Sequence, residues 1–317
     1  MDIFKHCFEK LTDEDIKTMK EYFDGYDYRG AGYTFLANYI WRTSYCLCWE
    51  RISDYLSIAG ADCMTREPKA IVSMPLTRDG NYDKGKLRKV ILESKKRFEE
   101  RGVDFSIHLI PGHMVHFLEE AFPGEMEFTH DRDADEYVYE KEKLINLPGR
   151  ALHKKKNHLN YFLKTYKYET KPITLDMVPQ LMELVDQIRS ERSYGEEELE
   201  SLNAESTAIT EILRFIDDPR VYTVAILIKG KVEAFAIGEK LSEDTAVEHF
   251  EKANDNIRGL YQAICSEFCK ALPEEMIFVN REEDMSLENL RQAKEALKPH
   301  HMEEKFSGCF LYTSSVE

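Results

Sequence analysis

Long apolar runs are missing from this chain of 317 residues, and their absence excludes an integral membrane protein of the helical kind. No stretch approaches the roughly 18 apolar residues that a membrane-spanning helix needs. The opening segment, MDIFKHCFEKLTDEDI, is acidic and interrupted by charges, so it does not have the form of a signal peptide. Together these features predict a cytoplasmic protein without a transmembrane segment.

Common cofactor and catalytic motifs are missing as well. The chain has no Walker A loop, no nicotinamide fingerprint and no nucleophile elbow of the hydrolase type. Its seven cysteines include no CxxC pair. Cys265 and Cys269 lie one helical turn apart and could join His249 in a metal site, but we interpret them as small side chains on a packed helix face. We therefore expect no metal and no tightly bound cofactor.

Positive charge is also scarce, since 43 Lys and Arg face 59 Asp and Glu and the net charge is -16. This balance argues against nucleic-acid binding by the surface as a whole. Residues 150–167 are the exception, because they carry basic side chains and no acid. We expect a helix here, with Lys154, Lys155 and Asn157 in its first turns binding an anion such as a CoA phosphate or a tRNA acceptor end. A solvated basic face is the alternative.

Two similar α/β series follow each other along the chain. Each alternates strands and helices over about 150 residues, which is a typical domain size. We predict an α/β (α+β) protein of two domains, 1–147 and 148–317, each a mixed sheet flanked by helices. In the second half, Val221–Ile228 and Val232–Leu241 are predicted strands joined at Lys229-Gly230, where glycine suits a hairpin turn.

The second half also holds the stretch that is most informative about function. Thr245–Lys252 alternates like a strand, and a helix with apolar residues on one face begins at Gly259. A helix that begins after a strand and loop has unpaired backbone N–H groups at its N-terminus, which attract anions. We therefore assign Arg258 and Gly259 to the phosphates of an acyl donor.

This stretch resembles the acyl-donor half of the GNAT (Gcn5-related N-acetyltransferase) superfamily, whose phosphate loop reads Arg/Gln-x-x-Gly-x-Gly/Ala. On this chain the motif falls on Asn256, Gly259 and Tyr261, of which the glycine matches. A wider set of motifs resembles a bacterial family of uncharacterised function, related to the C-terminal domain of phosphatidylglycerol lysyltransferases and more distantly to the Fem peptidoglycan aminoacyltransferases. These motifs are YTFLANYIWRTSY, INLPGRALHKKKNHLNYFLKTY, EAFAIGE, EHFEKAN, IRGLYQAI and VNREEDMSLENLRQAK. The resemblance implies a tandem pair of GNAT-like domains.

Acyl transfer to an amine needs groups that polarise the donor carbonyl and a base that takes the amine's proton. Strand alternation places His249 and Glu251 on one face as a candidate acid–base pair. Asn280 and Glu283 follow the next predicted strand, at the end where open α/β sheets bind ligands. We predict these four residues to be catalytic. A buried ion pair and a solvated capping turn are the alternatives.

The sequence thus predicts an acyltransferase that moves an acyl group from CoA, or an aminoacyl group from tRNA, to an amine or hydroxyl acceptor. The acceptor would be a small molecule, a lipid or a peptide. Two alternatives stay open. One is an acetyl-CoA-dependent N-acetyltransferase with an altered phosphate loop, and the other is a non-catalytic ligand-binding protein on the same fold.

Overall fold

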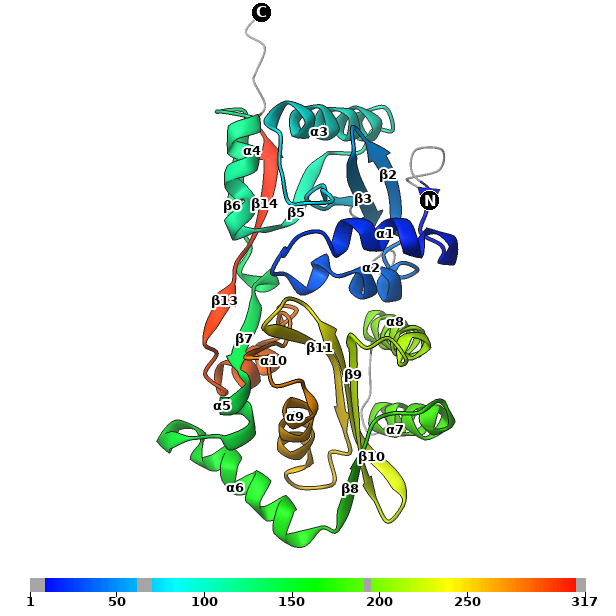
Figure 1. The fold of residues 1–317 in the computed structure, drawn as a ribbon, viewed down its shortest axis with the longest axis vertical. Coiled ribbons are helices and arrows are strands. Elements are labelled where there is room, and N and C mark those ends of the chain that lie inside the picture. Colours follow the sequence, from blue (N-terminus) through cyan, green and yellow to red (C-terminus); the bar gives the residue numbers. More distant parts are fainter. Residues whose placement is uncertain (1–8, 62–69, 191–194, 312–317) are drawn as a thin grey trace, which may run out of the picture. The chain divides into compact units, whose positions relative to one another are not determined.

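The structure is a computed structural model that describes residues 9–61, 70–190 and 195–311. It divides into two compact units (Figure 1). Unit 1 is drawn from the chain up to Asp135 and from Glu303 onward, and unit 2 is Glu136–Met302. Within the described ranges, no helix is both long enough and apolar enough to cross a membrane.

The helices and strands of unit 1 are, in chain order, β1 (Glu9–Lys10), α1 (Ile16–Phe23), α2 (Phe35–Trp41), β2 (Cys48–Ile52), β3 (Tyr55–Ala61), β4 (Ala70–Val72), α3 (Lys84–Glu99), β5 (Ser106–Pro111), α4 (Val115–Ala121), β6 (Met126–His130) and β14 (Lys305–Phe310). Those of unit 2 are β7 (Glu136–Glu140), α5 (Lys141–Asn146), α6 (Gly149–Thr165), β8 (Tyr168–Lys171), α7 (Val178–Ser190), α8 (Glu196–Ile212), β9 (Val221–Ile228), β10 (Lys231–Lys240), β11 (Thr245–Ala253), α9 (Leu260–Ala271), β12 (Phe278–Asn280), α10 (Glu288–Glu295) and, leading out of the unit, β13 (His301–Glu303).

Both units contain a seven-stranded sheet with the same strand arrangement. The order in unit 1 is β1-β2-β3-β4-β5-β14-β6, and in unit 2 it is β8-β9-β10-β11-β12-β7-β13. In each sheet the fourth and fifth strands are parallel, and the sixth place is filled by a strand from a distant part of the chain. The predicted fold class, two tandem units with mixed sheets flanked by helices, is confirmed.

The observed units correct the predicted boundary at 147/148. Tyr139 of β7 pairs with Val279 of β12, so β7 and the helix after it belong to unit 2. β14 pairs with β5 and β6, so the last strand belongs to unit 1. The Pro148-Gly149 signal marks only the end of α5, where Leu147 and Gly149 take positive φ values of 44° and 79°. A helix end and a domain end leave the same turn residues in the sequence.

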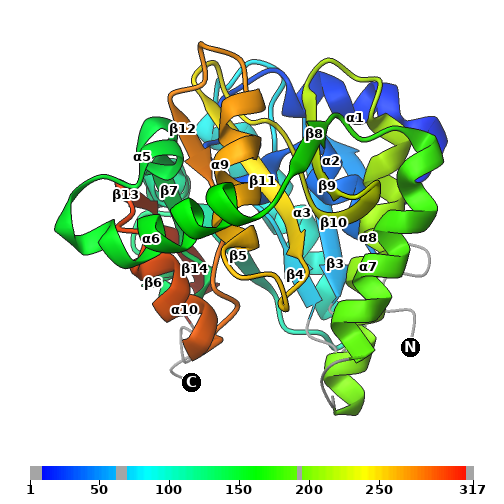
Figure 2. The ribbon, with the colours of Figure 1, turned by 90° about the horizontal axis from the view of Figure 1, so that it is seen from below.

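The central hairpin of unit 2 follows directly from its turn residues. Lys229 and Gly230 have φ values of 53° and 81°, the two left-handed conformations of a two-residue turn that matches strand twist. The predicted hairpin is therefore confirmed, with β9 and β10 on either side. α9 packs on one face of the sheet with α6 across it, and α7 packs on the other face (Figure 2).

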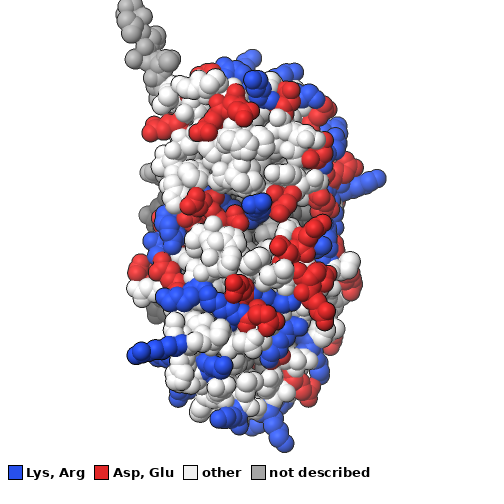
Figure 3. Space-filling model, turned by 60° about the vertical axis from the view of Figure 1, so that its left-hand side comes forward, with Lys and Arg blue, Asp and Glu red and all other residues white. Residues whose placement is uncertain are grey.

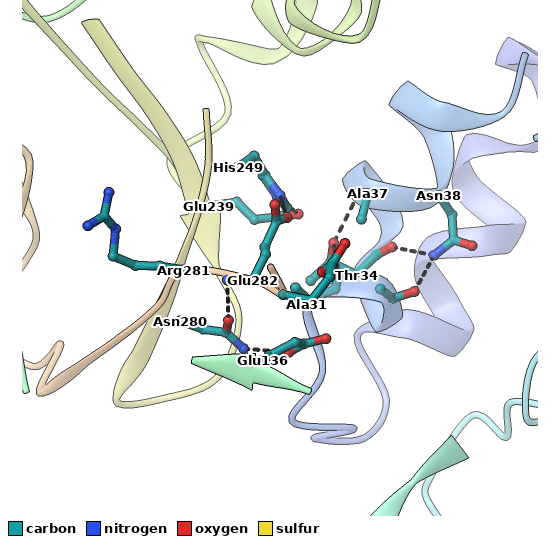
Figure 4. Close-up of polar contacts among 12 residues, drawn as sticks. Ala31, Thr34, Ala37, Asn38, Glu136, Glu239, His249, Asn280, Arg281 and Glu282 are labelled. Carbon is teal, nitrogen blue, oxygen red and sulfur yellow. Dashed lines mark hydrogen bonds and ion pairs between the residues drawn. The ribbon is translucent and has the colours of Figure 1, made fainter. Parts of the chain in front are cut away.

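In unit 1, two polar residues of the YTFLANYIWRTSY motif form hydrogen bonds at the N-terminal end of α2. Thr34 accepts a hydrogen bond from the Ala37 N–H at 3.1 Å, which satisfies a free donor of the first turn. The Asn38 amide donates to the carbonyl oxygens of Gly32 and Thr34, at 2.9 Å each (Figure 4). These contacts are local, so this part of the motif fixes the start of a helix.

Candidate functional site

The parallel strands β11 and β12 run side by side for only three residue pairs, the last of which is Val247 with Asn280. Beyond this pair, β11 continues along β10, while the chain after β12 turns into a loop. We call this divergence the unit 2 fork and define it by residues 248–253 of β11 and 280–287 after β12. The four residues predicted to be catalytic lie here.

His249 is an extra residue in β11. Gly238 of β10 faces Glu248 and the residue before Gly238 faces Phe250, so His249 has no partner and forms a β-bulge. Gly238 is needed here, because a Cβ atom would lie 2.1 Å from a carbonyl oxygen of β11. The bulge interrupts the regular alternation of side chains. For that reason His249 and Glu251 do not meet, and the predicted acid–base pair between them is wrong.

His249 is held between two carboxylates (Figure 4). Its Nε2 lies 2.9 Å from Glu239 and its Nδ1 lies 2.7 Å from Glu282, and its side chain is 1% exposed. Burial alone lowers the pKa of His249, but the hydrogen bonds to Glu239 and Glu282 outweigh it and raise the pKa to about 10. His249 is therefore an imidazolium at neutral pH. Both ring nitrogens donate, so it orients Glu282 and does not act as a base.

Arg281 points away from His249 and occupies the other side of the fork (Figure 4). Its Nε lies 2.5 Å from Glu248 and its Nη2 lies 2.9 Å from Glu251. Burial raises the pKa of Glu251 well above its usual range, although Arg281 opposes this. Burial, and then the charge of Arg281, lowers the pKa of the half-buried Lys155 of α6. Glu251 thus belongs to a buried ion cluster with Arg281 and Glu248, and the charge of Arg281 reaches Lys155.

Asn280 is fully buried at the end of β12. Its Nδ2 donates to Glu136 at 2.6 Å, and its Oδ1 accepts from the Glu282 N–H at 2.8 Å. Glu282 has a φ of 57°, a left-handed conformation that is uncommon for a residue other than glycine. Since both ends of the Asn280 amide are engaged, Asn280 fixes the shape of the loop and is not free to contact a substrate.

Glu283 is the predicted catalytic residue whose environment suits proton transfer. Its side chain is half-buried. Burial, followed by the charges of Glu282 and Glu136, raises the pKa of Glu283 to about 7, and Lys294 partly opposes them. A carboxylate that exchanges its proton near neutral pH can serve as a general base at that pH. Glu283 therefore has the proton affinity that the proposed chemistry needs.

The predicted phosphate loop has a different role in the structure. α9 begins after Gly259 as predicted, and Gly259 has a φ of 87°. A Cβ atom there would lie 2.1 Å from the His158 carbonyl oxygen of α6, so the glycine permits close packing of two helices. The backbone of α6 thus lies against Gly259, at the place where we expected the phosphates of an acyl donor. Arg258 is exposed and stacks on Tyr161, with 4.7 Å between its Cζ and the ring centroid.

The basic residues of α6 divide between the interior and the surface. Lys155 is half-buried and its pKa is lowered by burial and then by the charge of Arg281, whereas Lys154 and Asn157 are exposed. Basic side chains stand out in the lower part of the face drawn in Figure 3, mixed with acidic ones. The three predicted anion ligands thus do not form one clamp. The thiols of Cys265 and Cys269 pack in the core, and no group of three or more metal-binding side chains occurs among the described residues.

The sequence analysis did not single out four residues that lie in the fork or contact it, namely Arg281, Glu282, Glu239 and Lys294. Arg281 and Glu282 lie between the predicted residues Asn280 and Glu283. The sequence therefore showed that they are in this loop, but it did not show in which direction their side chains point. Glu239 and Lys294 lie on β10 and α10, and nothing in their local sequence connects them with this loop. Only the fold brings them there.

Two mixed sheets with diverging parallel strands, repeated in tandem, define a tandem GNAT-like fold. The chain belongs to the family described as phosphatidylglycerol lysyltransferase, C-terminal, whose model matches residues 33–308. It is similar to a conserved protein of unknown function from Bacteroides thetaiotaomicron, with a TM-score of 0.81 and 27% identity over 96% of this chain and 99% of that one.

More distant structures share the fold. L-PGS from Bacillus licheniformis has a TM-score of 0.65 and 11% identity, covering 96% of this chain and 93% of that chain. A tandem GNAT protein from the clavulanic acid biosynthesis pathway has a TM-score of 0.51 and 12% identity, covering 96% and 98%. An uncharacterised protein of Mycoplasmoides gallisepticum is 23% identical over 187 residues, which are 57% of this chain and 58% of that protein. The match thus spans little more than half of that relative.

Proposed function

We propose that this protein is a cytoplasmic acyltransferase whose unit 2 moves an aminoacyl or acyl group from an activated donor to an amine or hydroxyl acceptor. Family membership and the GNAT-like fold support the reaction class. The observation that carries the assignment to this site is Glu283, a half-buried carboxylate with a pKa of about 7 at the end of β12. Such a group can take a proton from an acceptor at neutral pH.

The fork suggests how the transfer would run with an amine acceptor. Glu282, oriented by His249, attracts the acceptor's ammonium group. Glu283 removes one proton, the neutral nitrogen attacks the donor carbonyl carbon, and a new C–N bond forms as the ester or thioester bond breaks. Protonated Glu283 then gives this proton to the departing oxygen or sulfur, and the positively charged nitrogen of the new C–N bond loses its remaining extra proton to solvent, which leaves a neutral amide. Glu283 thus acts first as a base and then as an acid.

Because ion pairs occupy the fork, we favour an aminoacyl ester over an acyl-CoA as the donor. The pantetheine arm of CoA is an extended chain with two amides, and such chains bind along open strand edges. In this protein the edge of β11 beyond Val247 is occupied by Arg281 and its ion pairs with Glu248 and Glu251. An aminoacyl-tRNA presents its ester at the end of a nucleic acid and needs no such arm.

A non-catalytic binding protein is the second candidate, and one observation favours it. The N-terminus of α9, where the fold's anion site was expected, is packed beneath α6 at Gly259. A chain that has lost this site could keep the fold for ligand recognition alone.

Ligand-dependent thermal stability separates the candidates. A ligand that binds only the native state at 100 times its dissociation constant adds about 2.7 kcal/mol of stability. We expect stabilisation by aminoacyl-tRNA and none by acetyl-CoA or longer acyl-CoAs. Stabilisation by CoA compounds would favour the acetyltransferase, and stabilisation without turnover would favour the binding protein.

Replacing the proposed base tests the mechanism. Glu283→Gln should lower turnover by about 10²–10⁴-fold, the usual contribution of a general base, while leaving donor binding intact. Wild-type turnover should rise with pH through about 7, because Glu283 acts in its ionised form. Glu274→Gln is the matched control, since Glu274 is exposed elsewhere in unit 2. Equal turnover in the two variants would remove Glu283 from the mechanism.

A further inference from the structure

Lys294 of α10 directs its ammonium group at the backbone of the loop after β12. Its Nζ donates to the carbonyl oxygens of Arg281 and Glu283, at 2.5 Å each, and of Glu282 at 3.1 Å. A lysine ammonium has three N–H donors, so three successive carbonyl groups use all of them. The same Nζ lies 5.7 Å from the ring centroid of Tyr137. Lys294 is therefore fully engaged in holding this loop.

The loop would not take this shape on its own. Three consecutive carbonyl groups can point at one atom only if the chain curls, and Glu282 accordingly has a φ of 57°. Holding such a residue left-handed costs about 1–3 kcal/mol, which surrounding contacts must offset. Asp284 provides a second attachment, because Arg291 of α10 binds it through Nε at 2.8 Å and Nη2 at 2.9 Å. Two side chains of α10, Lys294 and Arg291, thus bind the loop on either side of Glu283.

We infer that Lys294 is a positioning residue of the site, which holds residues 281–283 in the curl that sets Glu282 against His249 and presents Glu283 at the fork. The inference rests on the proposed function only in treating Glu283 as the base. Lys294 also provides positive charge beside Glu283, which is further influenced by the charges of Glu282 in the loop and Glu136 on β7. The two glutamates raise the pKa of Glu283 and Lys294 lowers it.

Opposite substitutions should therefore shift the titration of Glu283 in opposite directions. Lys294→Met keeps the length of the side chain but removes its charge, so the pKa of Glu283 should rise by about one pH unit. Glu282→Gln removes a negative neighbour, so this pKa should fall by a similar amount. The measurement is a carbon-13 NMR titration of protein labelled at glutamate carboxyl groups, with the Glu283 signal assigned by its loss in Glu283→Gln. Lys298→Met, an exposed change just after α10, is the control and should leave the midpoint unmoved.

A second readout tests positioning apart from charge. In Lys294→Met the amide hydrogens of residues 281–284 should exchange faster, while those of β9 and β10 stay protected. Lys294→Arg carries the test if the methionine variant does not fold. It keeps the charge, but a planar guanidinium cannot direct three N–H groups from one atom. We expect it to retain the Glu283 midpoint and still to accelerate exchange in the loop.

The inference would be overturned by an unmoved or lowered Glu283 midpoint in Lys294→Met, or by unchanged loop exchange in both Lys294 variants. Neither measurement requires turnover. A wild-type protein that is inactive with every donor would count against the proposed function, whereas the titration and exchange results would still decide the role of Lys294.

Discussion

In each unit, the fourth and fifth strands of the sheet separate after a short parallel stretch. The side chains that fill the space between the separating strands differ in chemistry between the two units. In unit 1, β4 and β5 pair only at Val72 and Ile107, after which the chain follows β3. Tyrosine hydroxyls then hold the backbone of residues 74–77. Tyr28 bonds both the N–H and the C=O of Thr77, at 3.1 and 3.0 Å. The other two contacts are Tyr33 with the Met74 N–H and Tyr82 with the Pro75 carbonyl.

In unit 2 the corresponding gap is filled by charged groups instead. Arg281 bridges Glu248 and Glu251, while His249 bridges Glu239 and Glu282. Burial raises the pKa of Tyr28 in unit 1 to about 12, so that tyrosine keeps its proton at neutral pH, whereas Glu283 in unit 2 has a pKa of about 7. The comparison shows that the same strand arrangement can be stabilised at this point by neutral hydrogen bonds or by ion pairs. Of these two fillings, the ionic one lies next in the chain to Glu283, the base that we propose.

We expect the largest effect from a substitution that removes the ion pairs of the unit 2 fork. Arg281→Ala leaves Glu248 and Glu251 without their shared cation, and an uncompensated buried charge costs about 3–5 kcal/mol. Urea denaturation should show this loss of unfolding free energy. The control is Arg258→Ala, which removes an exposed stacking contact that contributes below about 1 kcal/mol. If both variants lost the same small amount, the cluster would not hold the fork.

The packing of α6 on α9 predicts an effect of the next size. Gly259→Ala combines a strained φ with a clash against the His158 carbonyl oxygen, so we expect a loss of about 2–4 kcal/mol in thermal unfolding experiments. Gly149→Ala is the matched control, since Gly149 also has a positive φ but no atom lies within 4 Å of the position that a Cβ atom would take there. Its cost should be only about 1–2 kcal/mol. Equal costs would argue that α6 does not press on Gly259.

The neutral filling of unit 1 predicts the smallest effect. Tyr28→Phe removes a hydroxyl that satisfies two backbone groups of the buried Thr77, which costs about 1–2 kcal/mol. Tyr161→Phe removes an exposed hydroxyl and should stay within about 0.5 kcal/mol of wild type. Chemical denaturation of both variants would check the difference. A Tyr28→Phe protein as stable as wild type would mean that water replaces the hydroxyl.

Much of the fold was accessible from the sequence because its signals are local. The Lys229-Gly230 turn, the apolar face of α9 and the repeated strand–helix order depend on residues a few positions apart. The location of the candidate site after β12 was also predicted, since polar residues at a strand end are visible in a linear sequence. Glu283, the base that we propose, was predicted by this reasoning.

The tertiary structure decided the surroundings of each of these polar side chains. A one-residue bulge at His249 separates this residue from Glu251. The alternating pattern of the sequence gives no sign of the bulge. Gly259 matched a phosphate-loop position, yet its role is set by α6, a hundred residues earlier in the chain. Lys294 approaches Glu283 only through the packing of α10. Sequence thus determined local conformation, whereas burial and charge, which fix a pKa, arise from side chains that only folding brings together.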